Sequence, residues 1–300
     1  MISVLIPVHN YLIQSLVENL YQQLKELEID WEILISDDAS EENIKNKNFK
    51  FISNLSNGRI QFHSQKSNIG NAANRNFLGN TAKQDWLLFL DADTLPVHKN
   101  FIELYMRRIS SSESPIISGN VVYRNDENSH LLRWKYGKEK EELTLIERSK
   151  KPKLTSRGAN FVIKKEVFSR NQFHLLKEKY GFVDTRFFLQ FHKKQFDLIE
   201  NPVYHLGLES SAKYLDKVEF AIATLLKLHY NDKVKEHEND LLKTFTLMKK
   251  TGLNYICSGL YKLFNPAIRK NLLSKNPKIV LLQLYKILYM CNYDLNKKAH

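Results

Sequence analysis

Apolar runs that alternate with helical segments constrain the fold of this chain more than any other feature. A helical spacing of apolar residues between residues 13 and 27 and an Ala/Asn-rich stretch after Gly70 separate these runs. Short apolar runs of this kind are typical of strands covered on both faces. They occupy residues 2–7, 31–36 and 86–90, with a weaker one at 59–63. The β-α-β-α-β order predicts right-handed crossovers and a mostly parallel sheet.

The strongest chemical signal follows the run at residues 86–90, which leads directly into Asp91 and Asp93. Ligands of an open α/β sheet bind just beyond the carboxyl ends of its strands. Two carboxylates at such an edge are costly to desolvate unless they are paired. A hard divalent cation that also holds a phosphate is a suitable partner. A solvated acidic turn at the strand end is the alternative.

From residue 124 onward the sequence pattern differs from that of the first half of the chain. Residues 124–157 are polar and mixed, which predicts a long excursion over the sheet face. Beyond about residue 210 the pattern is helical. The other expected elements are strands at 116–123 and 161–163, a helix at 184–194, and extended residues at 197–199 and 201–205. We therefore expect an α/β catalytic domain over residues 1–209 and a helical region over 210–300.

The net charge of +12 is concentrated near the C-terminus. Residues 241–300 carry 11 Lys and Arg and a single acid, Asp294, for a net charge of 11 − 1 = +10. Such a segment favours an anionic partner. Amphipathic helices lying on an anionic membrane and a helical cap with a solvated basic face both remain open. We expect no nucleic-acid partner, because no known nucleic-acid module is present.

Cysteine usage and hydropathy indicate the compartment. Cys257 and Cys291 are too few and too far apart for a disulfide framework or a thiolate metal site. They fit a reducing cytosol. No apolar run approaches the ~20 residues needed to span a bilayer, and Met1 is followed by a strand pattern rather than a signal region. We expect a cytoplasmic protein, peripheral on the cytoplasmic face of the membrane.

Four motifs occur in order along the first 208 residues. They are VLIPVHN at 4–10, ILISDDAS at 33–40, NIGNAANRN at 68–76 and FLDAD at 89–93. Each motif is weak alone, but together they resemble the family 2 glycosyltransferases of GT-A fold, which are inverting enzymes that use nucleotide-sugar donors. The resemblance implies a Rossmann-like, mostly parallel central sheet with helices on both faces.

The resemblance assigns the nucleotide site to the loops after these strands. Asp38, favoured over Asp37, would accept the imide N–H of uracil, which makes UDP the favoured nucleotide. A helix N-cap is the alternative for this pair. Arg75 would lie near the diphosphate, with a solvated helix face as the alternative. The other nucleotide-binding residues that the resemblance implies are Pro7, Val8, Asn10, Asn68 and Asp91.

The resemblance also assigns a metal and a base. Asp93 would ligate Mn²⁺ or Mg²⁺, which assists the departing nucleoside diphosphate. His205, in an Asn-Pro-x-x-His pattern, would complete the metal site, although a lone His after a strand is more often structural. Asp184, in the motif at residues 181–185, would deprotonate the acceptor hydroxyl, with a helix cap as the alternative. Val183 stands where the family has Glu, which predicts altered specificity or impaired activity.

Four further residues are candidates for contact with sugar. Gly158 and Asn160 resemble the family's small-residue segment near the donor sugar. Trp134 and Tyr136 could stack on a sugar ring, and burial in a core is equally consistent with them. The expected activity is transfer of a hexose or N-acetylhexosamine to a glycan or lipid-linked acceptor, in the assembly of surface polysaccharide or lipopolysaccharide.

Two other functions remain as alternatives. Residues 88–94 also match the phosphatases of haloacid dehalogenase type, in which Asp91 would attack phosphorus and Asp93 would act as acid/base. In those enzymes the motif closes the first strand, whereas two β-α units precede it here. The second alternative is a catalytically impaired glycosyltransferase-like assembly partner, which Val183 favours.

Overall fold

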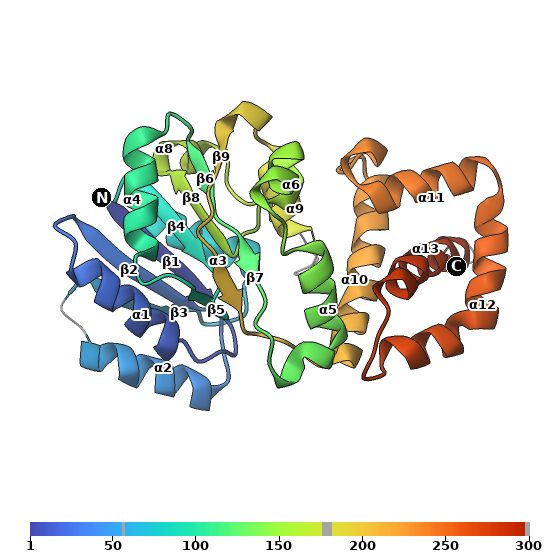
Figure 1. Cartoon of the computed structure of the whole chain (residues 1–300), viewed down its shortest axis with the longest axis horizontal. Coiled ribbons are helices and arrows are strands. Elements are labelled where there is room, and N and C mark those ends of the chain that lie inside the picture. The colour runs from blue at the N-terminus through green and yellow to red at the C-terminus, as the bar shows by residue number, and fades with distance from the viewer. Residues whose placement is uncertain (56–57, 176–181, 298–300) are drawn as a thin grey trace. The chain divides into compact units, whose positions relative to one another are not determined.

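The computed structural model of the 300-residue chain describes residues 1–55, 58–175 and 182–297 (Figure 1). Its contacts divide the described residues into two compact units. The first unit falls within 1–124, 140–179 and 183–207, and the second within 125–139, 180–182 and 208–300. The second unit thus resumes at residue 208, close to the predicted boundary, and also takes in residues 125–139, which the sequence assigned to the catalytic domain.

A seven-stranded sheet forms the centre of the first unit, in the order β3-β2-β1-β4-β8-β6-β9. The first four strands in this order run parallel, β8 is antiparallel to both of its neighbours, and β6 is parallel to β9. The strands are β1 (Ile2–Val8), β2 (Trp31–Asp37), β3 (Ile60–Ser64), β4 (Trp86–Leu90), β6 (Ile116–Ser118), β8 (Asn160–Lys164) and β9 (Phe196–Leu198). The predicted mostly parallel sheet is confirmed. Because Val8 pairs with Asp37, β1 and β2 end at the same edge.

A three-stranded sheet combines β5 (Thr94–Pro96), β10 (Val203–His205) and β7 (Val121–Val122). Its antiparallel β10–β5 pairing sets His205 opposite Thr94, the residue after Asp93. The strand predicted over 116–123 is two strands in different sheets. The chain leaves the first sheet at Gly119, where an added Cβ would lie 2.4 Å from the Asn160 side chain, so no larger residue fits.

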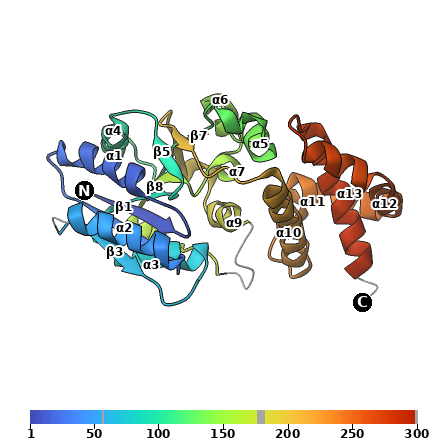
Figure 2. The ribbon, with the colours of Figure 1, turned by 90° about the horizontal axis from the view of Figure 1, so that it is seen from below.

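Helices cover both faces of the central sheet. Figure 2 shows α1 and α4 on one side of β1 and α3 on the other. The face under α3 and α8 holds a phenylalanine-rich core, in which the rings of Phe89 and Phe161 stack at 5.0 Å. The helices are α1 (Gln14–Lys25), α2 (Glu42–Leu55), α3 (Asn71–Thr81), α4 (Phe101–Ser111), α6 (Leu145–Lys150), α7 (Pro152–Thr155), α8 (Lys165–Arg170), α9 (Val183–Leu189) and the 3₁₀ turn η2 (Lys193–Gln195).

The described residues of the second unit are helical, as the sequence predicts for 210–300. Helix α13 packs against α10, α11 and α12. Ser210 and Asn239 cap α10 and α11 by accepting backbone N–H groups. The elements are η1 (Glu127–His130), α5 (Leu132–Lys140), α10 (Ser211–Tyr230), η3 (Glu236–Glu238), α11 (Asp240–Lys250), α12 (Leu253–Leu272) and α13 (Ile279–Lys297). Among the described residues, none of the helices combines the length and hydropathy that crossing a membrane requires.

Candidate functional site

Side chains tie together the loops that follow β1 and β2. Asn10 adopts the left-handed region at φ 53°, which asparagine tolerates better than most residues. Its N–H donates to Ser40 Oγ at 2.8 Å, and its Oδ1 accepts from the Glu41 N–H at 2.7 Å. His9 Nδ1 lies 2.9 Å from the carbonyl oxygen of Asp38. The predicted nucleotide-binding loops therefore form one hydrogen-bonded cluster.

Asp38 organises the chain that leads into α3. Its carboxylate accepts the N–H groups of Ile69 at 2.6 Å and Gly70 at 2.9 Å, and the residue is only 3% exposed. Asn68 Nδ2 donates to the Asp38 carbonyl at 3.4 Å. Each carboxylate oxygen keeps a further lone pair. Both oxygens nevertheless already bind backbone N–H groups in front of α3, whereas the capping alternative concerned the helix that follows residue 40.

Arg75 of α3 joins two acids that are far apart in sequence. Its Nη2 donates to Asp91 Oδ1 at 2.5 Å, and its Nη1 donates to Asp184 Oδ1 at 2.7 Å. The arginine side chain is 1% exposed, and its guanidinium lies 5.2 Å from the ring centroid of Phe173. This burial excludes the solvated helix face, while the contact with the diphosphate stays a prediction.

The electrostatics of this cluster follow from its burial. Burial would lower the pKa of Arg75, but the charges of Asp91 and Asp184 outweigh it and raise that pKa. Burial raises the pKa of Asp91, and the nearby charge of Asp93 acts in the same direction, against the opposing effect of Arg75. The Arg75 charge therefore favours the ionised form of Asp91.

Gly158 and α9 complete the surroundings of Asp184. The Gly158 N–H donates to Asp184 Oδ2 at 2.9 Å. A Cβ added to Gly158 would lie 2.6 Å from Asp184 Oδ1 and 2.7 Å from Arg75 Nη2, so the close approach requires glycine. Val183 packs against the phenylalanine-rich core. Gly181, which opens the predicted base motif, lies outside the described residues.

Asp93 and His205 lie close together at the end of the smaller sheet where β5 begins and β10 ends. His205 Nε2 lies 3.6 Å from Asp93 Oδ2, and the Tyr123 ring stacks on the imidazole at 5.6 Å between centroids. A Cβ on Gly207 would lie 2.0 Å from the same Asp93 oxygen. Burial and then the charge of Asp93 raise the pKa of Tyr11. Sequence reasoning assigned no role to Tyr11 or Gly207, although Gly207 ends the His205 motif.

The residues present fit part of a metal site. His205 Nδ1 is buried and has no hydrogen-bond partner among the described residues. In the same described part of the chain, no group of three or more His, Cys, Asp or Glu side chains could hold a metal alone. One imidazole and one carboxylate suit a Mn²⁺-like cation that takes its other ligands from diphosphate oxygens and water.

Three other predicted residues act through the sheet or the backbone. Asn160 is 0% exposed, and its side chain bonds Tyr105 and two backbone carbonyls, so it supports the sheet rather than facing a ligand. Val8 is buried, and its carbonyl accepts the Asp38 N–H at 2.8 Å. Pro7 pairs with Ser36 of β2.

Trp134 and Tyr136 belong to α5, in the second unit. The Tyr136 ring lies 5.9 Å from the Tyr214 ring, and Lys286 Nζ lies 4.2 Å from its centroid. These contacts favour the packing alternative for Tyr136.

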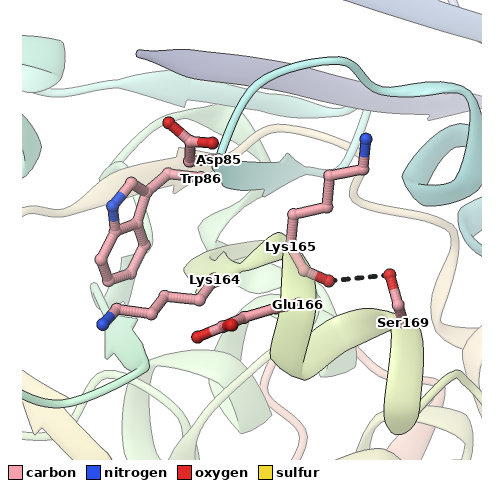
Figure 3. A pocket seen from close by; sticks show the side chains of 6 residues that line it. All are labelled: Asp85, Trp86, Lys164, Lys165, Glu166 and Ser169. Carbon is pink, nitrogen blue, oxygen red and sulfur yellow. Dashed lines mark hydrogen bonds between the residues drawn. The ribbon is translucent and has the colours of Figure 1, made fainter.

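A cavity of about 490 Å³ lies at the opposite edge of the central sheet, around the amino end of β4 (Figure 3). It is lined by Asp85, Trp86, Lys164, Lys165, Glu166 and Ser169. Figure 3 shows Ser169 bonded to the Lys165 carbonyl, and Lys164 Nζ lies 5.6 Å from the Trp86 ring centroid. Its acidic and basic side chains offset one another, and it contains none of the predicted site residues.

Comparison with known proteins defines the class. A model of the family described as "Glycosyl transferase family 2" matches residues 3–171, which is more than half of the chain. Among solved structures, the mannosyltransferase PcManGT from Pyrobaculum calidifontis, in complex with GDP-Man and Mn²⁺, has a TM-score of 0.58 at 13% identity, covering 99% of this chain and 87% of that one. S. aureus TarS 1-349 in complex with UDP-GlcNAc has a TM-score of 0.48 at 15% identity, covering 99% and 92%. No curated protein matches significantly.

The fold and the family match agree on a glycosyltransferase of GT-A type. The chain belongs to glycosyltransferase family 2. The resemblance found in its four sequence motifs is thereby confirmed.

Proposed function

We propose that this glycosyltransferase is an inverting, metal-dependent enzyme that transfers a hexose or N-acetylhexosamine from a nucleoside diphosphate sugar, with UDP as the favoured nucleotide. The observation that carries the proposal is the double ion pair of Arg75. One guanidinium holds Asp91 of the D-x-D motif and Asp184 at 2.5 and 2.7 Å. The Arg75 side chain therefore binds both a carboxylate of the proposed donor site and the candidate base.

Asp184 has the surroundings that a general base needs. Its two oxygens are oriented by Arg75 and by the Gly158 N–H, and its side chain is still 32% exposed. An acceptor hydroxyl would give its proton to Asp184 while its oxygen attacks the anomeric carbon. The bond from that carbon to the diphosphate breaks, and its electron pair leaves with the nucleoside diphosphate, which inverts the configuration.

Asp93 and His205 are the residues that would hold Mn²⁺ or Mg²⁺. When bound, the cation supplies positive charge for the departing diphosphate. Arg75 donates one hydrogen bond to each acid, so we assign it to holding Asp91 and Asp184 in place, and its remaining N–H groups leave the predicted contact with the diphosphate open. Asp91 would reach the ribose or a metal-bound water through the oxygen that Arg75 leaves free.

UDP is the favoured nucleotide because Asp38 could accept an imide N–H with a remaining lone pair. Asn10 and Asn68 belong to the hydrogen-bonded loops that contact Asp38 and its neighbour Ser40. PcManGT binds GDP-Man, but a likeness at 13% identity concerns the fold, so the nucleotide must be measured.

The proposed acceptor is a glycan or a lipid-linked sugar used in surface polysaccharide or lipopolysaccharide assembly. The support is the net charge of +10 over residues 241–300, which suits work at the cytoplasmic face of an anionic membrane.

A catalytically impaired glycosyltransferase-like protein is the second candidate. Val183 stands where the family has Glu, and its apolar side chain packs against the phenylalanine-rich core. Such a protein would bind donor without turnover. The phosphatase alternative loses support, since the chain belongs to family 2 and Asp91 is bound by Arg75.

Asp184→Asn tests the proposed function. We expect this variant to keep nucleotide binding, measured by thermal shift, and to lose sugar transfer and donor hydrolysis. Transfer at the wild-type rate would remove Asp184 as the base. Donor binding with no turnover in the wild-type chain would favour the impaired candidate.

A further inference from the structure

Helix α12 exposes its apolar residues. Six large apolar side chains on this helix are between 39% and 69% exposed. We refer to them as the α12 face, which consists of Leu253, Tyr255, Ile256, Leu260, Leu263 and Phe264. At 100° per residue these positions share roughly half of the helix circumference. A single exposed leucine needs no explanation, but a contiguous apolar face marks an interaction site.

The buried side of α12 is unusually polar by comparison. Where the helix packs on α13, its buried residues include Asn254, Cys257 and Ser258. Ser258 Oγ donates to Asn292 Oδ1 at 3.1 Å. An amphipathic helix normally directs its apolar stripe at the core. In the first half of α12 the fully buried side chains are small, Tyr261 packs half-buried on Tyr285 and Tyr289 of α13, and the large aliphatic side chains face outward.

Basic residues accompany this face, and one of them, Arg269, pairs with Glu219 and Asp216 of α10. The 20 residues of α12 contain Lys262, Arg269 and Lys270 but no Asp or Glu. Lys262 lies at one border of the face, and exposed Lys275 and Lys278 follow the helix. Within the described part of the chain, none of these four lysines forms an ion pair with an acid.

We propose that the α12 face docks on the surface of an anionic phospholipid membrane, with its apolar side chains in the interface and its lysines among the head groups. The proposal rests on the proposed function, because it assigns to one helix the membrane partner suggested there by overall charge. Tyr255 and Phe264 suit such an interface, since aromatic rings favour the boundary between apolar and polar layers. A second copy of the chain is a poorer occupant, because it would bring the same positive charge against this face.

Vesicle sedimentation with the full chain tests the proposal. The probes are vesicles of phosphatidylcholine alone and of phosphatidylcholine mixed with phosphatidylglycerol. We expect binding to the mixed vesicles only, weakening with added salt. The double change Ile256→Gln and Leu263→Gln should lower partitioning about tenfold or more. The double change Lys262→Gln and Lys270→Gln should lower it about 25-fold, at about fivefold for each lysine.

Ile146→Gln is the matched control, because Ile146 is 74% exposed but lies on α6 in the first unit. It should bind vesicles as the wild type does. An equal loss in this control, or no loss in the α12 variants, would overturn the proposal. A dimer in light scattering that the α12 variants convert to a monomer would overturn it in favour of self-association.

A nucleotide thermal shift on the same α12 variants separates the two proposals, and it should remain at the wild-type value. Absence of vesicle binding in a chain that still transfers sugar would remove the docking surface alone. Vesicle binding by a chain that neither binds nor transfers donor would remove the proposed function alone.

Discussion

Replacing Arg75 with methionine removes the cation that holds Asp91 and Asp184 together. The guanidinium is 1% exposed, while the two acid side chains are 28% and 32% exposed. Unit charges about 4 Å apart attract by about 4 kcal/mol at an effective dielectric constant of 20, before the cost of desolvation is subtracted. Removing one partner from a buried pair costs about 3–5 kcal/mol. Because water can reach both acids, we expect Arg75→Met to lose about 2–4 kcal/mol of unfolding free energy at neutral pH.

The pH dependence of this loss distinguishes electrostatics from packing. Without the arginine, burial and the charge of Asp93 raise the folded-state pKa of Asp91 further above the unfolded value of about 4. The folded variant then binds protons more tightly than the unfolded chain, so it regains stability as the pH falls through this range. The difference in unfolding free energy between Arg75→Met and the wild type should therefore become smaller in acid.

Denaturant unfolding at several pH values measures both effects. Arg107→Met is the matched control, because its side chain is 72% exposed and pairs with Glu103 on the same helix. Exposed pairs of this kind contribute little, so we expect a change below about 0.5 kcal/mol. Equal losses in the two variants, or a loss for Arg75→Met that does not change with pH, would refute the reasoning.

Three further predictions concern other positions. Gly207→Ala should displace the Asp93 carboxylate and abolish metal-dependent nucleotide binding, because its Cβ would lie 2.0 Å from that oxygen, whereas Gly259→Ala, with open space around its Cβ, should leave thermal-shift titrations unchanged. Burial would raise the pKa of Asp197, but bidentate hydrogen bonds from an arginine on α4 outweigh it and lower that pKa. Its contribution is thus present at neutral pH and lost as pH falls through the lowered pKa, so Asp197→Asn should cost about 1 kcal/mol at pH 7 and nothing in strong acid, as unfolding curves would show. Burial raises the pKa of Cys291 to about 12, so a thiol reagent should modify this residue only in denaturant, and rapid modification of the native chain would contradict its burial.

Local patterns predicted the central sheet because buried parallel strands have a distinct composition. The runs at residues 2–7, 31–36 and 86–90 form β1, β2 and β4, and the helix after Gly70 is α3. Helices α2 and α4 and strand β5 were not predicted. The signal for α4 was present in Phe101, which starts an apolar set buried against the sheet, while β5 is three residues long and exists through its pairing with β10.

The candidate site was predicted only in part, because tertiary contacts decide what its side chains do. Nothing near Arg75 in sequence indicates that its guanidinium, which binds Asp91, also binds Asp184, 109 positions later. Asn160 follows the glycine of a family motif, yet its side chain is enclosed by Tyr105 and neighbouring carbonyls. Tyr11 lies beside a predicted nucleotide-binding loop, but its proximity to the D-x-D motif follows only from the fold.

A thermal-shift titration of the wild type and Asp93→Ala with UDP, GDP, dTDP and CDP, each with and without Mn²⁺, tests the central claim most directly. A nucleotide at about 100 times its Kd should stabilise the wild type by about 2.7 kcal/mol, which is a shift of several degrees. We predict such a shift with UDP that requires Mn²⁺ and is lost in Asp93→Ala. No shift of the wild type with any nucleotide, or an undiminished metal-dependent shift in Asp93→Ala, would contradict a metal-dependent donor site at Asp93.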